Sequence, residues 1–289
     1  MRTTILALAL MFCACGPTNR GDDDDTGSGG DDGSGSNGDG CSDAAKLVYV
    51  VDAKNKLSKF DPATKTFTDI GNLSCTTTLP FGQPFSMGVD RNAVAWVLYN
   101  DGELFRVDTQ SLMCTKTTWA AQNGMMLFGM GFSTNVAGGT DDTLFIAGGL
   151  NQQTTTSKLA TLSTSAFSSM PVGSVSGWPE LTGTGNAELW GWFPSNADGS
   201  GTPRVEQIEK TSGAPMKSFP LAMLSGSPTA WAFAFWGGDF WIFLQRGGET
   251  STTVYQIDGK TGMMKGSTPA PGREIVGAGV STCAPVVIL

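Results

Sequence analysis

Apolar and polar residues alternate from residue 41 onward, and the apolar segments are short and separated by turns rich in Gly, Asp, Ser and Thr. No long stretch has the periodicity of an amphipathic helix. Alternation over about four to eight residues, bounded by turn residues, is typical of half-buried strands. The pattern therefore predicts an all-β domain that occupies residues 41–289.

Five apolar segments recur along this domain at a nearly constant spacing. Their second residues lie 48, 49, 45 and 51 positions apart, and they are Val48, Trp96, Phe145, Trp190 and Trp241. Because three of the five are tryptophan at equivalent positions, we expect them to pack between neighbouring sheets rather than to bind a ligand.

A second recurring element follows each of these segments. Four of the five turns read apolar, acid, two variable residues, hydroxyl, and their acids are Asp61, Asp108, Glu209 and Asp258. The third turn departs from the pattern, with Ser163 in the acid position. An acid at the start of a turn accepts hydrogen bonds from backbone N–H groups two or three residues later. We therefore interpret these acids as structural.

A period near 48 residues with several strands in each unit is typical of a β-propeller. The repeats resemble those of the kelch, quinoprotein-like and YVTN propeller families, particularly in Ile257-Asp-Gly-Lys-Thr-Gly262. The resemblance implies a propeller over residues 46–285, which is the length of five units of 48 residues. A β-sandwich or an open β-repeat is the alternative.

The end of the chain indicates how such a ring closes. Met87-Gly-Val89 and Met130-Gly-Phe132 have the small residues of an innermost strand and each precedes an aromatic segment. Ala278-Gly-Val280 has the same character but no strand pair follows it. We expect it to pair with Leu47–Val51, so that one blade contains both ends of the domain and no sheet edge stays open.

The N-terminus has the features of an export signal. Arg2 precedes an apolar run, Ile5–Phe12, that is too short to span a bilayer, which takes about 20 residues. A signal peptide over residues 1–14 is therefore predicted. Phe12-Cys13-Ala14-Cys15-Gly16 resembles the bacterial lipobox, which implies that Cys15 carries diacylglycerol. Phe12 stands where the family usually has leucine, and secretion without lipid is the alternative.

Residues 15–40 are expected to be the lipidated cysteine and a disordered acidic linker. Seven aspartates lie in this segment, while the domain after it contains 16 basic and 19 acidic side chains, a net charge of −3. Composition of this kind buries too little apolar surface to fold. The domain shows no clustered basic surface for nucleic acid.

The cysteines fit an oxidising compartment. Cys13 leaves with the signal peptide, and four cysteines remain in the domain without any Cys-x-x-Cys pair. A closed ring brings Cys41 beside Cys283. Cys75 and Cys114 lie in neighbouring blades, so the predicted disulfides are Cys41–Cys283 and Cys75–Cys114.

Candidate chemistry is restricted by the absence of histidine from the sequence. A Ser-His-Asp triad is excluded. No cofactor fingerprint, phosphate loop or metal motif is present, and we expect no cofactor and no metal. A pair of carboxylates is the remaining catalytic option, since glycoside hydrolysis needs only that. The candidate acids are Asp90, Glu180 and Asp239.

Tryptophans outside the recurring position are candidate ligand-binding residues, because exposed aromatic rings stack on sugars and anchor protein partners. They are Trp178, Trp192, Trp231 and Trp236. The polar loops Asn151–Ser157, Ser195–Pro203 and Arg246–Thr252 are longer than their equivalents in the first two units, which predicts a binding face on that side of the ring.

The sequence therefore predicts a lipid-anchored protein of the cell envelope, in the outer membrane on its periplasmic side or at the cell surface. Its propeller is expected to bind a protein or a glycan without catalysis. A carboxylate-dependent glycoside-active enzyme and a structural envelope component are the alternatives.

Overall fold

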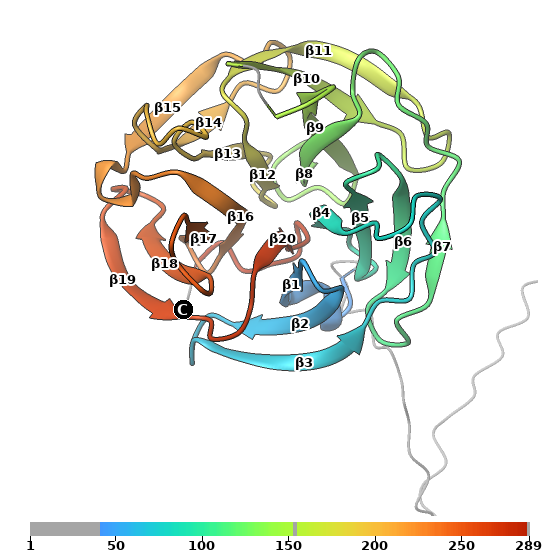
Figure 1. Ribbon diagram of the computed structural model, residues 1–289. Helices are drawn as coiled ribbons and strands as arrows, with labels where there is room; N and C mark the ends of the chain where they lie inside the picture. The colour runs from blue at the N-terminus through green and yellow to red at the C-terminus, as the bar shows by residue number, and fades with distance from the viewer. Residues whose placement is uncertain (1–40, 153–154, 288–289) are drawn as a thin grey trace, which may run out of the picture. The chain divides into compact units, whose positions relative to one another are not determined.

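The protein is a five-bladed β-propeller, as the computed structural model shows (Figure 1). The structure describes residues 41–152 and 155–287. The expected signal peptide, Cys15 and the acidic linker lie outside the described residues. Each blade is a four-stranded antiparallel sheet, and the prediction of an all-β ring is confirmed.

The twenty strands are arranged from the axis outward as follows. Blade 1 consists of β20 (Ile275–Gly279), β1 (Val48–Asp52), β2 (Lys56–Asp61) and β3 (Thr66–Asn72). Blade 2 consists of β4 (Pro84–Val89), β5 (Val94–Tyr99), β6 (Leu104–Asp108) and β7 (Cys114–Lys116). Blade 3 consists of β8 (Leu127–Thr134), β9 (Asp142–Gly149), β10 (Thr156–Leu162) and β11 (Ser169–Ser176). Blade 4 consists of β12 (Glu180–Gly183), β13 (Leu189–Phe193), β14 (Arg204–Ile208) and β15 (Pro215–Pro220). Blade 5 consists of β16 (Pro228–Trp236), β17 (Asp239–Arg246), β18 (Thr253–Asp258) and β19 (Met264–Pro269).

Blade 1 closes the ring with strands from both ends of the domain. β20 pairs with β1 through Tyr49 opposite Gly279 and Val51 opposite Gly277. The disulfide Cys41–Cys283, with 5.9 Å between its Cα atoms, covalently joins the same two ends. Cys75–Cys114 links blade 2 to the connection before it. Both disulfides have the pairing expected from the sequence.

Successive innermost strands run in the same direction around the axis. Gly129 of β8 lies so close to β12 that an added Cβ would be 2.8 Å from the Cα of Glu180, and two residues further along both strands Gly131 lies against Thr182. The ring therefore has two distinct faces. We call the side on which the innermost strands begin the pocket face, and the side on which they end the latch face.

The hydrophobic core consists of five layers, each between two neighbouring blades. The recurring aromatic position contributes to these layers. Trp241 packs on Phe60 of blade 1 with 5.3 Å between ring centroids, and Trp190 packs on Phe240 of blade 5 at 4.8 Å. These tryptophans hold adjacent blades together, as their recurrence in the sequence predicts.

The recurring turns connect the two outer strands of each blade on the latch face. Asp258 accepts hydrogen bonds from the backbone N–H of Lys260 and Thr261, and Asp108 does so from Gln110 and Ser111. In the exceptional third turn, the hydroxyl of Ser163 accepts the N–H of Ala166. The same turn geometry is thus retained where the acid is absent.

Candidate functional site: the axial pocket

A pocket of about 130 Å³ opens on the pocket face at the ring axis. Innermost strands of four blades supply its wall, together with one loop residue. The lining residues are Pro84 and Phe85 of β4, Glu180 of β12, Thr229, Ala230 and Trp231 of β16, Val276 of β20, and Gln152 between β9 and β10.

Glu180 is the ionisable residue of this pocket. Its side chain is 3% exposed. Ser86 Oγ, across the axis on β4, donates a hydrogen bond of 2.8 Å to Glu180 Oε2. Burial raises the pKa of Glu180 well above its usual range, while the bonds from Ser86 and from the backbone of Met130 partly oppose that rise. The carboxyl therefore retains its proton to a higher pH than a surface glutamate.

The latch face is covered by the segment that follows β20. This segment contacts every blade. Ser281 bonds to the carbonyl of Ala45 beside blade 1, and Thr282 bonds to Arg91 of blade 2 and Asp142 of blade 3. The carbonyl of Thr282 also lies against Gly185 of blade 4, and that of Pro285 accepts the N–H of Gly237 of blade 5. Because Ser281 and Thr282 are buried, the segment covers the ends of the innermost strands.

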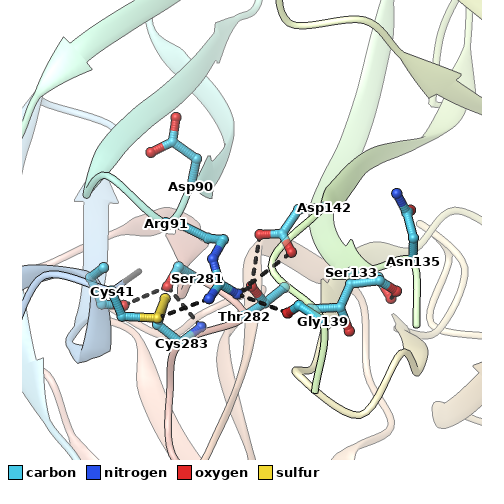
Figure 2. Close-up of polar contacts among 12 residues, drawn as sticks. Cys41, Asp90, Arg91, Ser133, Asn135, Gly139, Asp142, Ser281, Thr282 and Cys283 are labelled. Atoms are coloured by element: carbon cyan, nitrogen blue, oxygen red, sulfur yellow. Dashed lines mark hydrogen bonds and ion pairs between the residues drawn. A yellow bond between two sulfur atoms is a disulfide. The ribbon is translucent and has the colours of Figure 1, made fainter. Parts of the chain in front are cut away.

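Arg91 is the centre of this arrangement, which we call the latch (Figure 2). Its guanidinium lies 3.0 Å from Thr282 Oγ1, 3.2 Å from Cys41 Sγ and 3.8 Å from a carboxylate oxygen of Asp142. Burial raises the pKa of Asp142, although Thr282 and Arg91 act against the rise. The charge of Arg91 is thus paired with Asp142 within the fold. Cys41, the first described residue, lies on the face opposite the pocket.

The four candidate tryptophans have different surroundings. Trp192 is 0% exposed and Trp178 is 7% exposed, so neither can offer a ring face to a ligand, and for these two the expectation from sequence is corrected. Trp236 is half-buried and donates to the carbonyl of Lys46 on the latch side. Trp231 is half-buried and lines the axial pocket. Of the four, Trp231 alone lies at the pocket.

The three candidate acids do not converge. Asp90 follows the end of β4 on the latch face, where it bonds to the indole of Trp96. Asp239, also on that face, is 2.6 Å from Lys265 Nζ. Asp90 lies four positions after Ser86, the neighbour of Glu180, which corresponds to about 13 Å of extended strand. Glycosidase carboxyl pairs lie about 5 to 10 Å apart. The geometry thus separates Glu180 from the other two candidate acids.

The longer loops of blades 3 to 5 do lie on the pocket face. They span 150–155, 194–203 and 247–252, while their equivalents in blades 1 and 2 span 53–55 and 100–103. The base of the blade 4 loop is packed, since buried Ser195 bonds to the carbonyl of Gly201 and accepts the N–H of Gly226.

Within the described ranges, no group of three or more His, Cys, Asp or Glu residues could hold a metal ion. A second hollow of about 350 Å³ lies in blade 3 towards the latch face, and its acid, Asp142, already belongs to the latch. None of the helices in the described part of the chain is long and apolar enough to cross a membrane.

No family model matches the chain, and no curated protein matches it. Solved structures resemble it at low identity. A protein of unknown function from Bacteroides caccae is 13% identical, with a TM-score of 0.40 over 78% of this chain and 73% of that one. TolB from Acinetobacter baumannii is 12% identical, with a TM-score of 0.44 over 75% and 51%. Hydrazine synthase from Kuenenia stuttgartiensis is 12% identical, with a TM-score of 0.42 over 68% and 51%. The chain spans about half the length of the last two, and similarity this low bears on no activity or ligand.

Proposed function

We propose that the protein is an exported lipoprotein of the cell envelope, anchored through Cys15, whose propeller binds a protein partner on the pocket face. The observation that carries the proposal is the single ionisable group, Glu180, at an axial pocket whose opposite face is covered by residues Ser281–Pro285. A site of this kind receives a ligand from one direction.

The size of the pocket favours a protein partner over a free small molecule. Its volume of about 130 Å³ is that of roughly four water molecules, whereas pockets for small ligands occupy about 300–1,000 Å³. One inserted side chain fills such a space. A side chain buried in a central pocket and surrounded by a wider contact is the usual arrangement of an interface hot spot.

The position of Cys41 is compatible with an anchor that leaves the pocket accessible. Cys41 is held on the latch face by Cys283 and Arg91. A tether joined to the domain there has its attachment point on the face opposite the pocket and does not obstruct the pocket face.

Site-specific photo-cross-linking in a bacterium that exports the full chain tests this proposal. The cross-linker replaces Met223, which is 54% exposed on the pocket face, or Met263, which is 69% exposed on the latch face and is the matched control. We expect a discrete protein adduct from position 223 and none from position 263. Adducts with carbohydrate instead would indicate a glycan ligand, and adducts confined to position 263 would contradict the proposal.

A further inference from the structure

Glu180 is an exception to the composition of the ring axis. The five innermost strands β4, β8, β12, β16 and β20 contain one ionisable side chain among them, and it is Glu180. Every other position on these strands is apolar, glycine, proline or a hydroxyl residue. Glu180 is therefore the one position on these five strands that can carry a charge.

Hydrogen bonding within the fold does not account for an acid here. Glu180 accepts from Ser86 Oγ and from the backbone of Met130, and it makes no ion pair in the part of the chain that the structure describes. A glutamine amide oxygen would accept the same two bonds without the desolvation cost that a buried carboxylate incurs. Ionisation of this carboxyl therefore costs free energy unless a cation pairs with it.

In the described part of the chain, the strands around Glu180 supply no cation that could pair with its carboxylate. Strands β4, β8, β13 and β16 around it carry no ionisable side chain. β9 carries Asp142, which lies at the latch end of that strand. The cation must therefore come from a ligand.

We propose that the axial pocket receives the cationic side chain of a lysine or arginine that the partner protein presents, and that this group pairs with Glu180. The inference deepens the proposed function and rests on it. The side chain enters as a cation, Glu180 gives up its proton to solvent, and the resulting carboxylate pairs with the ammonium or guanidinium group. Charge and protons balance: one proton leaves for each cation bound.

The walls of the pocket suit such a group. Phe85 and Trp231 line it, and aromatic rings attract cations held near their faces. A divalent metal ion is a poorer fit, because Ca²⁺ takes about six to eight oxygen ligands and the pocket has one carboxyl group. The volume of about 130 Å³ admits the end of one long side chain.

The test uses short peptides, Ac-Gly-Ser-X-Ser-Gly-NH₂, in which X is Lys, Arg, Gln or norleucine, titrated into the full chain. Binding is followed by the indole ¹⁵N–H signal of Trp231, assigned with Trp231→Phe. We expect the Lys or Arg peptide to shift this signal with millimolar affinity and the Gln and norleucine peptides to have no effect. Equal shifts from all four peptides, or none, would overturn the inference.

Two variants and one pH series sharpen the result. Glu180→Gln should reduce the affinity at least tenfold while the protein remains folded by thermal melting. Asp141→Asn, at an exposed acid between β8 and β9 on the latch face, is the matched control and should bind as the unmodified protein does. In the unmodified protein, the affinity should rise about tenfold for each unit by which the pH increases, up to the pKa of Glu180, because binding releases one proton. Affinity independent of pH would contradict the exchange of a proton for a cation.

Cross-linking from position 223 separates this inference from the proposed function. If adducts form equally in the Glu180→Gln background, a protein binds the pocket face but no cation pairs with Glu180. If no adduct forms in either background, the proposed function itself is wrong.

Discussion

Thr282 Oγ1 donates a hydrogen bond of 2.7 Å to Asp142 Oδ2, across 140 positions of sequence. The bond joins the segment after β20 to the start of β9 in blade 3, next to the guanidinium of Arg91. The closure of the ring therefore depends on polar contacts as well as on the pairing of β20 with β1.

Removing Cys41–Cys283 should destabilise the domain more than removing Cys75–Cys114. The bridges span 242 and 39 residues, for which the chain-entropy relation gives about 5 and about 4 kcal/mol, with smaller losses usual in practice. Urea unfolding of the two double Cys→Ala variants measures the difference. A larger loss from the shorter bridge would show that the terminal bridge is not the main covalent constraint.

Arg91→Ala should cost about 3 kcal/mol of unfolding free energy at pH 8, since it leaves the buried Asp142 carboxylate without its cation. The loss should shrink at pH 4, where the raised pKa of Asp142 allows the carboxyl to become neutral. Adding Asp142→Asn should recover part of the loss at pH 8. A loss independent of pH and unchanged by Asp142→Asn would mean that Arg91 acts through packing alone.

Acid should weaken the fold through the recurring turns. Hydrogen bonds from Thr64 hold the pKa of Asp61 below its ordinary value, and bonds from Ser111 do the same for Asp108. A lowered pKa in the folded state stabilises the protein above the unfolded value near 4, and this contribution disappears as the pH falls. The urea midpoint should therefore decrease from pH 5 to pH 2.

Asp108→Asn should make that decrease shallower. Glu274→Gln is the control, because the carboxyl of Glu274 makes no hydrogen bond in the described structure. A midpoint that rises on acidification, or an equal effect of the two variants, would assign the acid sensitivity to other groups.

Cys15→Ser should move the exported protein from the membrane fraction to the soluble fraction, because each buried methylene of an acyl chain contributes about 0.8 kcal/mol to membrane binding. Cys13→Ser is the matched control, since Cys13 lies within the predicted signal peptide. Fractionation followed by detection of the domain gives the result. If the Cys15→Ser protein stays with membranes as fully as the unmodified one, the lipid anchor is wrong.

The ring could be predicted from sequence because its units repeat. Trp96, Trp190 and Trp241 occupy equivalent places between blades, so the need for a large side chain that packs on the next blade recurs in the sequence once per repeat. Ala278-Gly-Val280 resembles an innermost strand but has no strand pair after it in the sequence, which predicts that it closes the ring. The strand that contains Ala278 and Gly279, β20, does pair with β1. The terminal disulfide follows from the same closure.

The site was less accessible from the sequence, for two physical reasons. Blades are covered on both sides, so alternation along β13 does not separate exposed from buried residues: Trp192 and Phe193 face opposite sides of the blade and both are buried. The second reason is strand direction. Asp90 follows an innermost strand whereas Glu180 begins one, and because innermost strands run parallel, the two acids must lie on opposite faces.

The contacts of Ser281–Pro285 with all five blades have a consequence for biogenesis. Synthesis delivers the chain from its N-terminus, so β1 has no inner partner until the eighteen strands β2–β19 and then β20 have been made. Until then its inner edge is unpaired and Arg91 lacks Thr282. An incomplete chain therefore exposes an open sheet edge in blade 1, and the ring closes only when the last strand of the domain has been made.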